Sequence, residues 1–153
     1  MNKIKLSRII FKGLALTLLL LAINSLGVSA FARKLIEPNG PPDTIKMLQE
    51  VCRSYRLAVV SSSYRSEVEP PLVRGGIRPL FQMLICGDDV KNFKPSPEPY
   101  LLAAERMAAR RPLVIEDSEA GVASGRAAGF EVLQVSRVEN VGREVRKYLA
   151  GGV

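Results

Sequence analysis

The chain has 153 residues, 47% of them hydrophobic, which suffices for one domain with a buried core and is short for two domains of ordinary size. Its formal net charge of +7 falls to +3 without the four basic residues among the first thirteen, so the remaining charges fit a solvated surface and predict no nucleic-acid partner. The chain contains no His, which excludes a His-based catalytic triad and a His-ligated metal site.

The first thirty residues differ in character from the rest. Residues 1–13 are basic, residues 14–23 are an apolar run, and residues 28–30 are small, which is the layout of a secretory signal. A bilayer needs about twenty apolar residues, so a permanent transmembrane helix is the weaker interpretation. Three hypotheses remain for residues 1–30: an export signal or anchor, a replaced N-terminal piece of the domain, or a core element.

Residues 31–42 are rich in Pro and Gly and predict a linker, after which residues 43–153 form the folded core. Asp43 is expected to cap a helix whose apolar residues recur at three- and four-residue spacing. Short apolar runs predict strands that are covered on both faces, at residues 57–60, 81–86, 113–115 and 132–135. Helical patterns separate and follow these runs, at residues 98–110, 119–128 and 139–149. The alternation predicts a parallel, doubly wound α/β sheet.

Pro70 and Pro71 interrupt the helix that should follow the strand at residues 57–60 and its serines. An interior Pro costs a helix about 3 kcal/mol, so either the helix is broken in two or the domain is weakened. Cys52 and Cys86 fall within apolar elements and are interpreted as buried thiols, because no feature of their spacing indicates a disulfide or a redox pair.

Polar side chains lie where the predicted strands end. Ser61 ends its strand and is followed by Ser62, Lys94 lies in a Pro-bounded turn, and Glu116 and Asp117 follow another strand directly. Hydroxyls, an ammonium group and paired carboxylates are what a phosphoryl group and a divalent metal require. Each residue also has a structural interpretation: serines that cap a turn, a surface lysine, and a carboxylate that caps the next helix.

Three tracts carry a family resemblance: GDDVK at 87–91, KPSPEPY at 94–100 and IEDSEAGV at 115–122. They resemble the haloacid dehalogenase-like (HAD) hydrolase superfamily, most closely its phosphoglycolate phosphatase and β-phosphoglucomutase branch, over residues 36–138. The resemblance implies a Rossmannoid three-layer α/β/α domain with a mostly parallel sheet. It also implies catalytic roles for Lys94 and Ser61, phosphate binding by Ser61, Ser62 and Lys94, and Mg²⁺ binding by Asp117 and Glu116. Asp88 is expected to shape a loop beside the site.

The sequence departs from the family at its first motif. That motif, Asp-x-Asp-Gly followed by Thr or Val, supplies the aspartyl nucleophile and the general acid and base at the end of the first strand, whereas the first acidic residue here is Glu37. The first strand and the cap domain are therefore missing or replaced. Because the family's first strand lies in the middle of the sheet, its loss would leave a slot that residues 14–22 or a second chain could fill.

These observations predict a HAD-like core of the phosphomonoester phosphatase or phosphomutase type, impaired in catalysis because the nucleophile motif is absent. The alternative is a non-catalytic phosphate- or partner-binding remnant, exported through residues 1–30, that binds phosphate weakly with the help of Mg²⁺. A small phosphorylated metabolite is the expected ligand in either case. The resemblance implies a cytoplasmic location, with membrane association only through an uncleaved N-terminal anchor.

Overall fold

The computed structural model of the chain describes residues 18–23, 42–135 and 137–151. Its centre is a five-stranded parallel sheet with the strand order β3-β2-β1-β4-β5. The strands are β1 (Leu18–Ile23), β2 (Arg56–Ser61), β3 (Met83–Ile85), β4 (Leu113–Glu116) and β5 (Glu131–Gln134).

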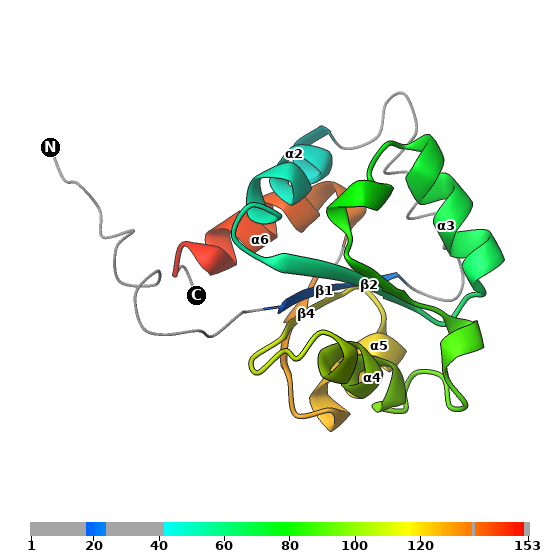
Figure 1. Cartoon of the computed structure of the whole chain (residues 1–153). Helices are drawn as coiled ribbons and strands as arrows, with labels where there is room; N and C mark the ends of the chain where they lie inside the picture. Colours follow the sequence, from blue (N-terminus) through cyan, green and yellow to red (C-terminus); the bar gives the residue numbers. More distant parts are fainter. Residues whose placement is uncertain (1–17, 24–41, 136, 152–153) are drawn as a thin grey trace, which may run out of the picture.

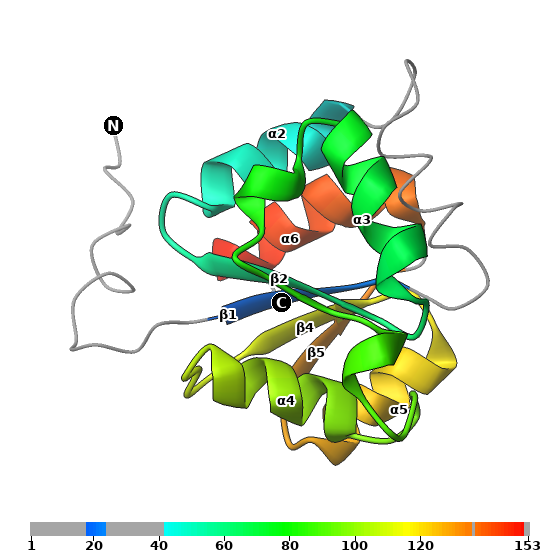
Figure 2. The ribbon, with the colours of Figure 1, turned by 45° about the vertical axis from the view of Figure 1, so that its right-hand side comes forward.

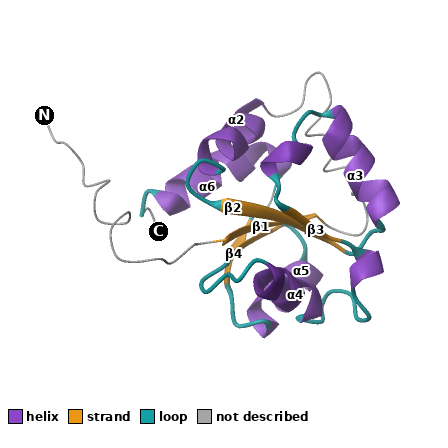
Figure 3. Ribbon diagram, in the orientation of Figure 1, coloured by secondary structure: helices purple, strands orange, loops and turns teal. Residues whose placement is uncertain are grey.

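Helices cover both faces of the sheet, so the predicted three-layer α/β/α architecture is confirmed (Figures 1, 2 and 3). The α-helices are α2 (Pro42–Val51), α3 (Arg65–Arg74), α4 (Glu98–Arg106), α5 (Glu119–Ala127) and α6 (Val141–Leu149). Three short 3-10 helices join them: η2 (Arg78–Leu80), η3 (Gly87–Asp89) and η4 (Val138–Asn140). Helices α2, α3 and α6 lie on one face, and α4 and α5 lie on the other. Among the described residues, none of the helices is long and apolar enough to span a bilayer.

Strand β2 shows why the short apolar runs form buried strands. Leu57 and Val59 point into the core under α2, α3 and α6, whereas Ala58 and Val60 point into the core under α4 and α5. All four side chains are buried. The alternation of side chains along a strand therefore requires apolar residues at every position here.

The central position of the sheet is filled by the chain's own residues. Strand β1 pairs in parallel with β2 on one side and with β4 on the other, so that Leu20 lies opposite both Ala58 and Val114. Residues 18–23 belong to the N-terminal segment, for which the sequence allows an export signal or anchor, a replaced terminus or a core element. The structure places this part of the segment in the slot that the first strand of the family would occupy.

Several predicted boundaries are wrong in detail. Strand β3 covers only Met83–Ile85 of the predicted 81–86, and α4 ends at Arg106 because the chain reaches a positive φ of 46° at Ala108. Helix α2 begins at Pro42, so Asp43 is not the N-cap; instead its Oδ1 accepts a hydrogen bond from Arg146 at 2.6 Å and ties α2 to α6.

Helix α3 runs through both Pro70 and Pro71 without a break. Its inner face is held by the buried residues Val68, Pro71 and Leu72, and the Ile77 amide beyond its end donates to the Leu72 carbonyl. Burial of the inner face therefore keeps the helix continuous despite the two missing amide donors.

Candidate functional site

The polar residues expected at strand ends come together at the carboxyl edge of the sheet. Strand β2 ends at Ser61, β4 ends at Glu116, and β3 leads within two residues into the turn Gly87–Asp89. All three strands run in the same direction, so these ends share one edge. Ligands of parallel α/β sheets bind at such an edge, which makes it the candidate site.

Glu116 is the centre of this edge and is 0% exposed. Its Oε1 accepts hydrogen bonds from Lys94 Nζ at 2.7 Å and from the Tyr100 hydroxyl at 3.1 Å. Its Oε2 accepts from the Asp117 amide at 2.9 Å, the Ser118 amide at 2.8 Å and Ser118 Oγ at 2.9 Å. Five donors therefore occupy the roughly four lone-pair directions of this carboxylate.

Lys94 reaches Glu116 from the loop before α4, and only 4% of its side chain is exposed. Besides the bond to Glu116, Nζ donates to the carbonyl of Val60 at 3.0 Å and lies 5.1 Å from the centroid of the Tyr100 ring. An ammonium group has three protons, so one remains beyond these two acceptors in the described part of the chain. The structure thus brings the predicted residues Lys94 and Glu116 together, beside the end of β2.

Burial and charge shift the pKa values of these groups in distinct ways. Burial lowers the pKa of Lys94, and the Glu116 carboxylate raises it part of the way back. Burial raises the pKa of Glu116, but Lys94 and the Ser118 donors outweigh this effect and hold the pKa below 4.5. Glu116 is therefore ionised at neutral pH. Burial, followed by the charge of Glu116, raises the pKa of Asp117 above its ordinary value.

Ser61 and the residues after it form a tight turn against the end of β3. Ser61 is buried, and its Oγ accepts a hydrogen bond from the Ser63 amide at 3.1 Å, while the Ser63 carbonyl accepts from the Gly87 amide at 2.8 Å. A Cβ on Gly87 would lie 2.8 Å from the Ser62 carbonyl oxygen, so only glycine fits this approach. No described residue accepts the Ser61 hydroxyl proton, which can therefore be donated to a ligand.

The described residues include no complete set of Mg²⁺ ligands. Glu116 is filled by protein donors, which leaves Asp117 as the exposed carboxylate at the end of β4. Within residues 18–23, 42–135 and 137–151, no three Asp, Glu, Cys or His side chains gather in one place. The assignment of Mg²⁺ to Asp117 and Glu116 therefore has no support from the geometry of these residues.

Other residues of the edge have structural tasks. Asp88 Oδ2 accepts a hydrogen bond from the Arg65 amide at 2.8 Å, which agrees with its expected role in shaping a loop. Cys86 is buried, which raises its pKa to about 11 and makes it an unreactive thiol.

Sequence reasoning missed two residues that support Glu116. Tyr100 lies in the KPSPEPY tract, and its position six residues after Lys94, on the helix that follows, was the available signal. Gly121 lies in the first turn of α5, where a Cβ would overlap the Glu116 carboxylate. The N-terminus of α5 can therefore pack onto the buried carboxylate only because residue 121 is glycine.

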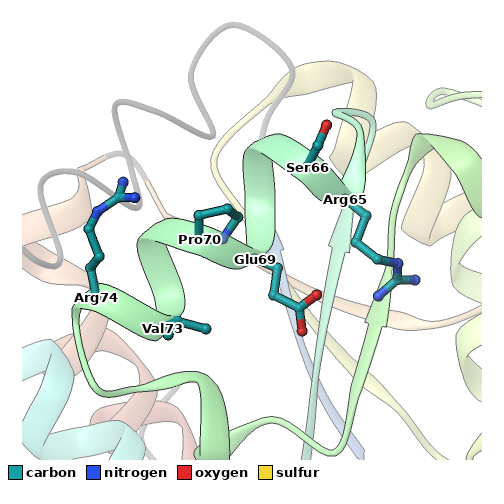
Figure 4. A pocket seen from close by; sticks show the side chains of 6 residues that line it. All are labelled: Arg65, Ser66, Glu69, Pro70, Val73 and Arg74. Atoms are coloured by element: carbon teal, nitrogen blue, oxygen red, sulfur yellow. The ribbon is translucent and has the colours of Figure 1, made fainter.

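A shallow groove of about 520 Å³ runs along the outer face of α3. Its lining residues come from this one helix (Figure 4): Arg65, Ser66, Glu69, Pro70, Val73 and Arg74. None of the predicted site residues lines it, so the groove and the strand-end site are separate features.

Residues 30–135 match the family described as haloacid dehalogenase-like hydrolase. The chain belongs to this family. Among curated HAD relatives, the chain is 33% identical over 96 residues to the pyrophosphatase PpaX of Bacillus pumilus, which covers 61% of this chain and 44% of that protein. It is 33% identical over 103 residues to a phosphorylated carbohydrates phosphatase of Thermotoga maritima, covering 66% of this chain and 47% of that protein.

The fold of the HAD family is found in solved structures as well. The crystal structure of CbbY from Rhodobacter sphaeroides in complex with phosphate superposes with a TM-score of 0.56 at 30% identity, covering 60% of this chain and 44% of that one. The chain spans about half the length of the curated relatives it matches. The expected phosphoglycolate phosphatase and β-phosphoglucomutase branch is confirmed by the names of its relatives.

The end of β1 locates the position that the HAD nucleophile motif would occupy in this sequence. The residue after Ile23 is Asn24, and the sequence continues as Ser25-Leu26-Gly27-Val28. This tract matches the Gly and Val of Asp-x-Asp-Gly-Thr/Val but has Asn and Leu where the family has its two aspartates. Residues 24–28 lie outside the described part of the chain, so the match rests on the sequence and on where β1 ends. The Gly-Val pair after an apolar run was the signal that a search for carboxylates missed.

Proposed function

We propose that this chain is a HAD-type domain that binds the phosphate group of a small phosphorylated metabolite at the carboxyl edge of its sheet without hydrolysing it. The observation that carries the proposal is that the central strand leads into Asn24 instead of an aspartate. An amide is a far weaker nucleophile than a carboxylate, so no aspartyl-phosphate can form at this position.

Two groups are available to bind a phosphoryl oxygen. Lys94 Nζ has one proton beyond its bonds to Val60 and Glu116, and the hydroxyl of Ser61, the residue after Val60, can donate as well. Relatives named for phosphorylated carbohydrates, fructose 1-phosphate and phosphoglycolate support a small phosphorylated metabolite as the ligand.

The charge at this edge predicts weak binding. Lys94 and Glu116 neutralise each other, so Asp117 presents a negative charge to an incoming anion. Replacing Asp117 with Asn should therefore tighten phosphate binding in the presence of a chelator. Measured in Mg²⁺, the same substitution would weaken binding at a metal-dependent site, so the sign of the change in Mg²⁺ separates the two mechanisms.

The test has two parts, both with the full chain. Phosphate titration followed by NMR should shift the amides of Ser62 and Lys94, and Lys94→Ala should abolish these shifts. Phosphate release from an aryl phosphate should stay at the blank level with and without Mg²⁺. Release above the blank that disappears in Lys94→Ala would overturn the non-catalytic part of the proposal.

A gain-of-function variant tests whether the defect is confined to the first motif. Asn24→Asp combined with Leu26→Asp restores both aspartates of the family motif and should give phosphate release above the blank in Mg²⁺. Leu26→Asp alone, which lacks a nucleophile, should not. A folded double variant without activity would show that the rest of the edge is also incompetent.

A further inference from the structure

Two large aromatic side chains are exposed at the candidate site. Tyr64 is 58% exposed and Phe93 is 46% exposed. Isolated exposed apolar residues are common on protein surfaces and need no explanation. These two differ because each is next in sequence to the site: Tyr64 follows the serine turn at the end of β2, and Phe93 precedes the buried Lys94.

Tyr64 and Phe93 both lie beside the turn Gly87–Asp89. The residues on either side of Tyr64 bind this turn, because the Ser63 carbonyl accepts from the Gly87 amide and the Arg65 amide donates to Asp88, each at 2.8 Å. Tyr64 is therefore fixed between two anchored neighbours.

The ring of Phe93 lies beside the same turn. A Cβ on Gly87 would lie 3.2 Å from Phe93 Cε1 and 2.8 Å from the Ser62 carbonyl oxygen. Phe93 therefore lies close to the serine turn, and the adjacent Lys94 side chain points inward to Glu116. The edge thus combines a buried cation and a hydroxyl with an exposed aromatic rim.

Such a rim suits a flat ligand group. The exposed face of an aromatic ring offers stacking to a planar group and burial of apolar area. We propose that the phosphate ester bound at this edge carries a planar aromatic group, as a nucleoside monophosphate does, and that Phe93 and Tyr64 contact that group. This inference rests on the proposed phosphate site and names its ligand class.

The experiment compares three probes on the full-length protein: inorganic phosphate, glucose 6-phosphate and adenosine monophosphate. Adenosine monophosphate should bind most tightly. Stacking on an aromatic side chain is typically worth about 1–3 kcal/mol. Phe93→Ala and Tyr64→Ala should therefore each weaken the binding of adenosine monophosphate about fivefold or more. Neither substitution should change the affinity for inorganic phosphate.

Two further variants sharpen the result. Phe93→Leu keeps an apolar side chain but removes the flat ring, and should lose the preference for adenosine monophosphate as Phe93→Ala does. Leu101→Ala removes a side chain that is 45% exposed on α4 and should change the binding of no probe.

The outcomes distinguish failure of this inference from failure of the proposed phosphate site on which it rests. Equal affinities for the three probes, unaffected by the aromatic substitutions, would overturn the aromatic ligand class and leave the phosphate site standing. Binding of none of the probes would overturn both. Loss of inorganic phosphate binding in folded Phe93→Leu would also contradict the inference, because the ring would then support the phosphate site itself.

Discussion

At the scale of single residues, the role of Lys94 changes most when its surroundings are known. The sequence resemblance makes it a ligand for phosphate, but its ammonium group also neutralises a carboxylate that is 0% exposed. An unpaired buried charge costs far more than a lost surface contact. Lys94 is therefore as much a structural residue as a binding residue.

Replacing Lys94 with Met should lower the free energy of unfolding by about 3–5 kcal/mol, because the carboxylate of Glu116 would remain buried without its partner. Urea unfolding measures this loss. Adding Glu116→Gln to Lys94→Met should recover part of it, and Lys91→Met, at an exposed lysine in the same loop, should have little effect. A Lys94→Met variant as stable as the wild type would refute the buried ion pair.

The depressed pKa of Glu116 gives stability a defined pH dependence. In the unfolded chain a glutamate takes up a proton near its ordinary pKa of 4.5, whereas folded Glu116 stays ionised to lower pH. Its contribution is therefore complete above about pH 4.5 and is lost as the pH falls through the folded pKa. Measured by urea unfolding, the stability difference between wild type and Glu116→Gln should shrink as the pH falls below about 4.5. A difference that stays constant over this range would contradict the assignment.

At the scale of elements, α5 depends on one glycine. In an open helix, Gly→Ala usually stabilises by about 1 kcal/mol. At Gly121 the sign should reverse, because a Cβ would overlap the Glu116 carboxylate. Thermal unfolding of Gly121→Ala should show a lower Tm, whereas Ala120→Gly, at an exposed neighbour, should lose only the propensity difference. A higher Tm for Gly121→Ala would mean that α5 does not pack on this carboxylate.

Sequence patterns predicted the elements better than their ends. The apolar runs predict β2, β4 and β5. The glycine after α5 marks the end of that helix, because Gly129 has a positive φ of 77°. The continuity of α3 through Pro70 and Pro71 was not predictable from propensity, because tertiary burial decides it. The same holds at the site: the sequence places the serines, Lys94 and the Glu116-Asp117 pair at strand ends, but the saturation of Glu116 also depends on Tyr100, which only the folded chain brings to it.

At the scale of the whole molecule, the fold depends on a strand from a segment that also has the layout of an export signal. Strand β1 pairs on both sides, so without it β2 and β4 would each expose a row of unpaired backbone groups. These two roles exclude each other in one folded molecule, because a cleaved signal leaves the domain. The core-strand hypothesis and the export-signal hypothesis therefore make opposite predictions for substitutions in β1.

Leu20→Pro tests the role of β1 in the sheet. Proline removes a backbone donor and does not fit a central strand, so this variant should lose its cooperative unfolding transition if β1 lies between β2 and β4. Glu131→Pro is the matched control, because it lies at the first position of the edge strand β5, where proline is tolerated. Circular dichroism during urea unfolding distinguishes the two variants. If Leu20→Pro unfolded like the wild type, the sheet would be complete without residues 18–23, and the segment would be free to serve as a signal.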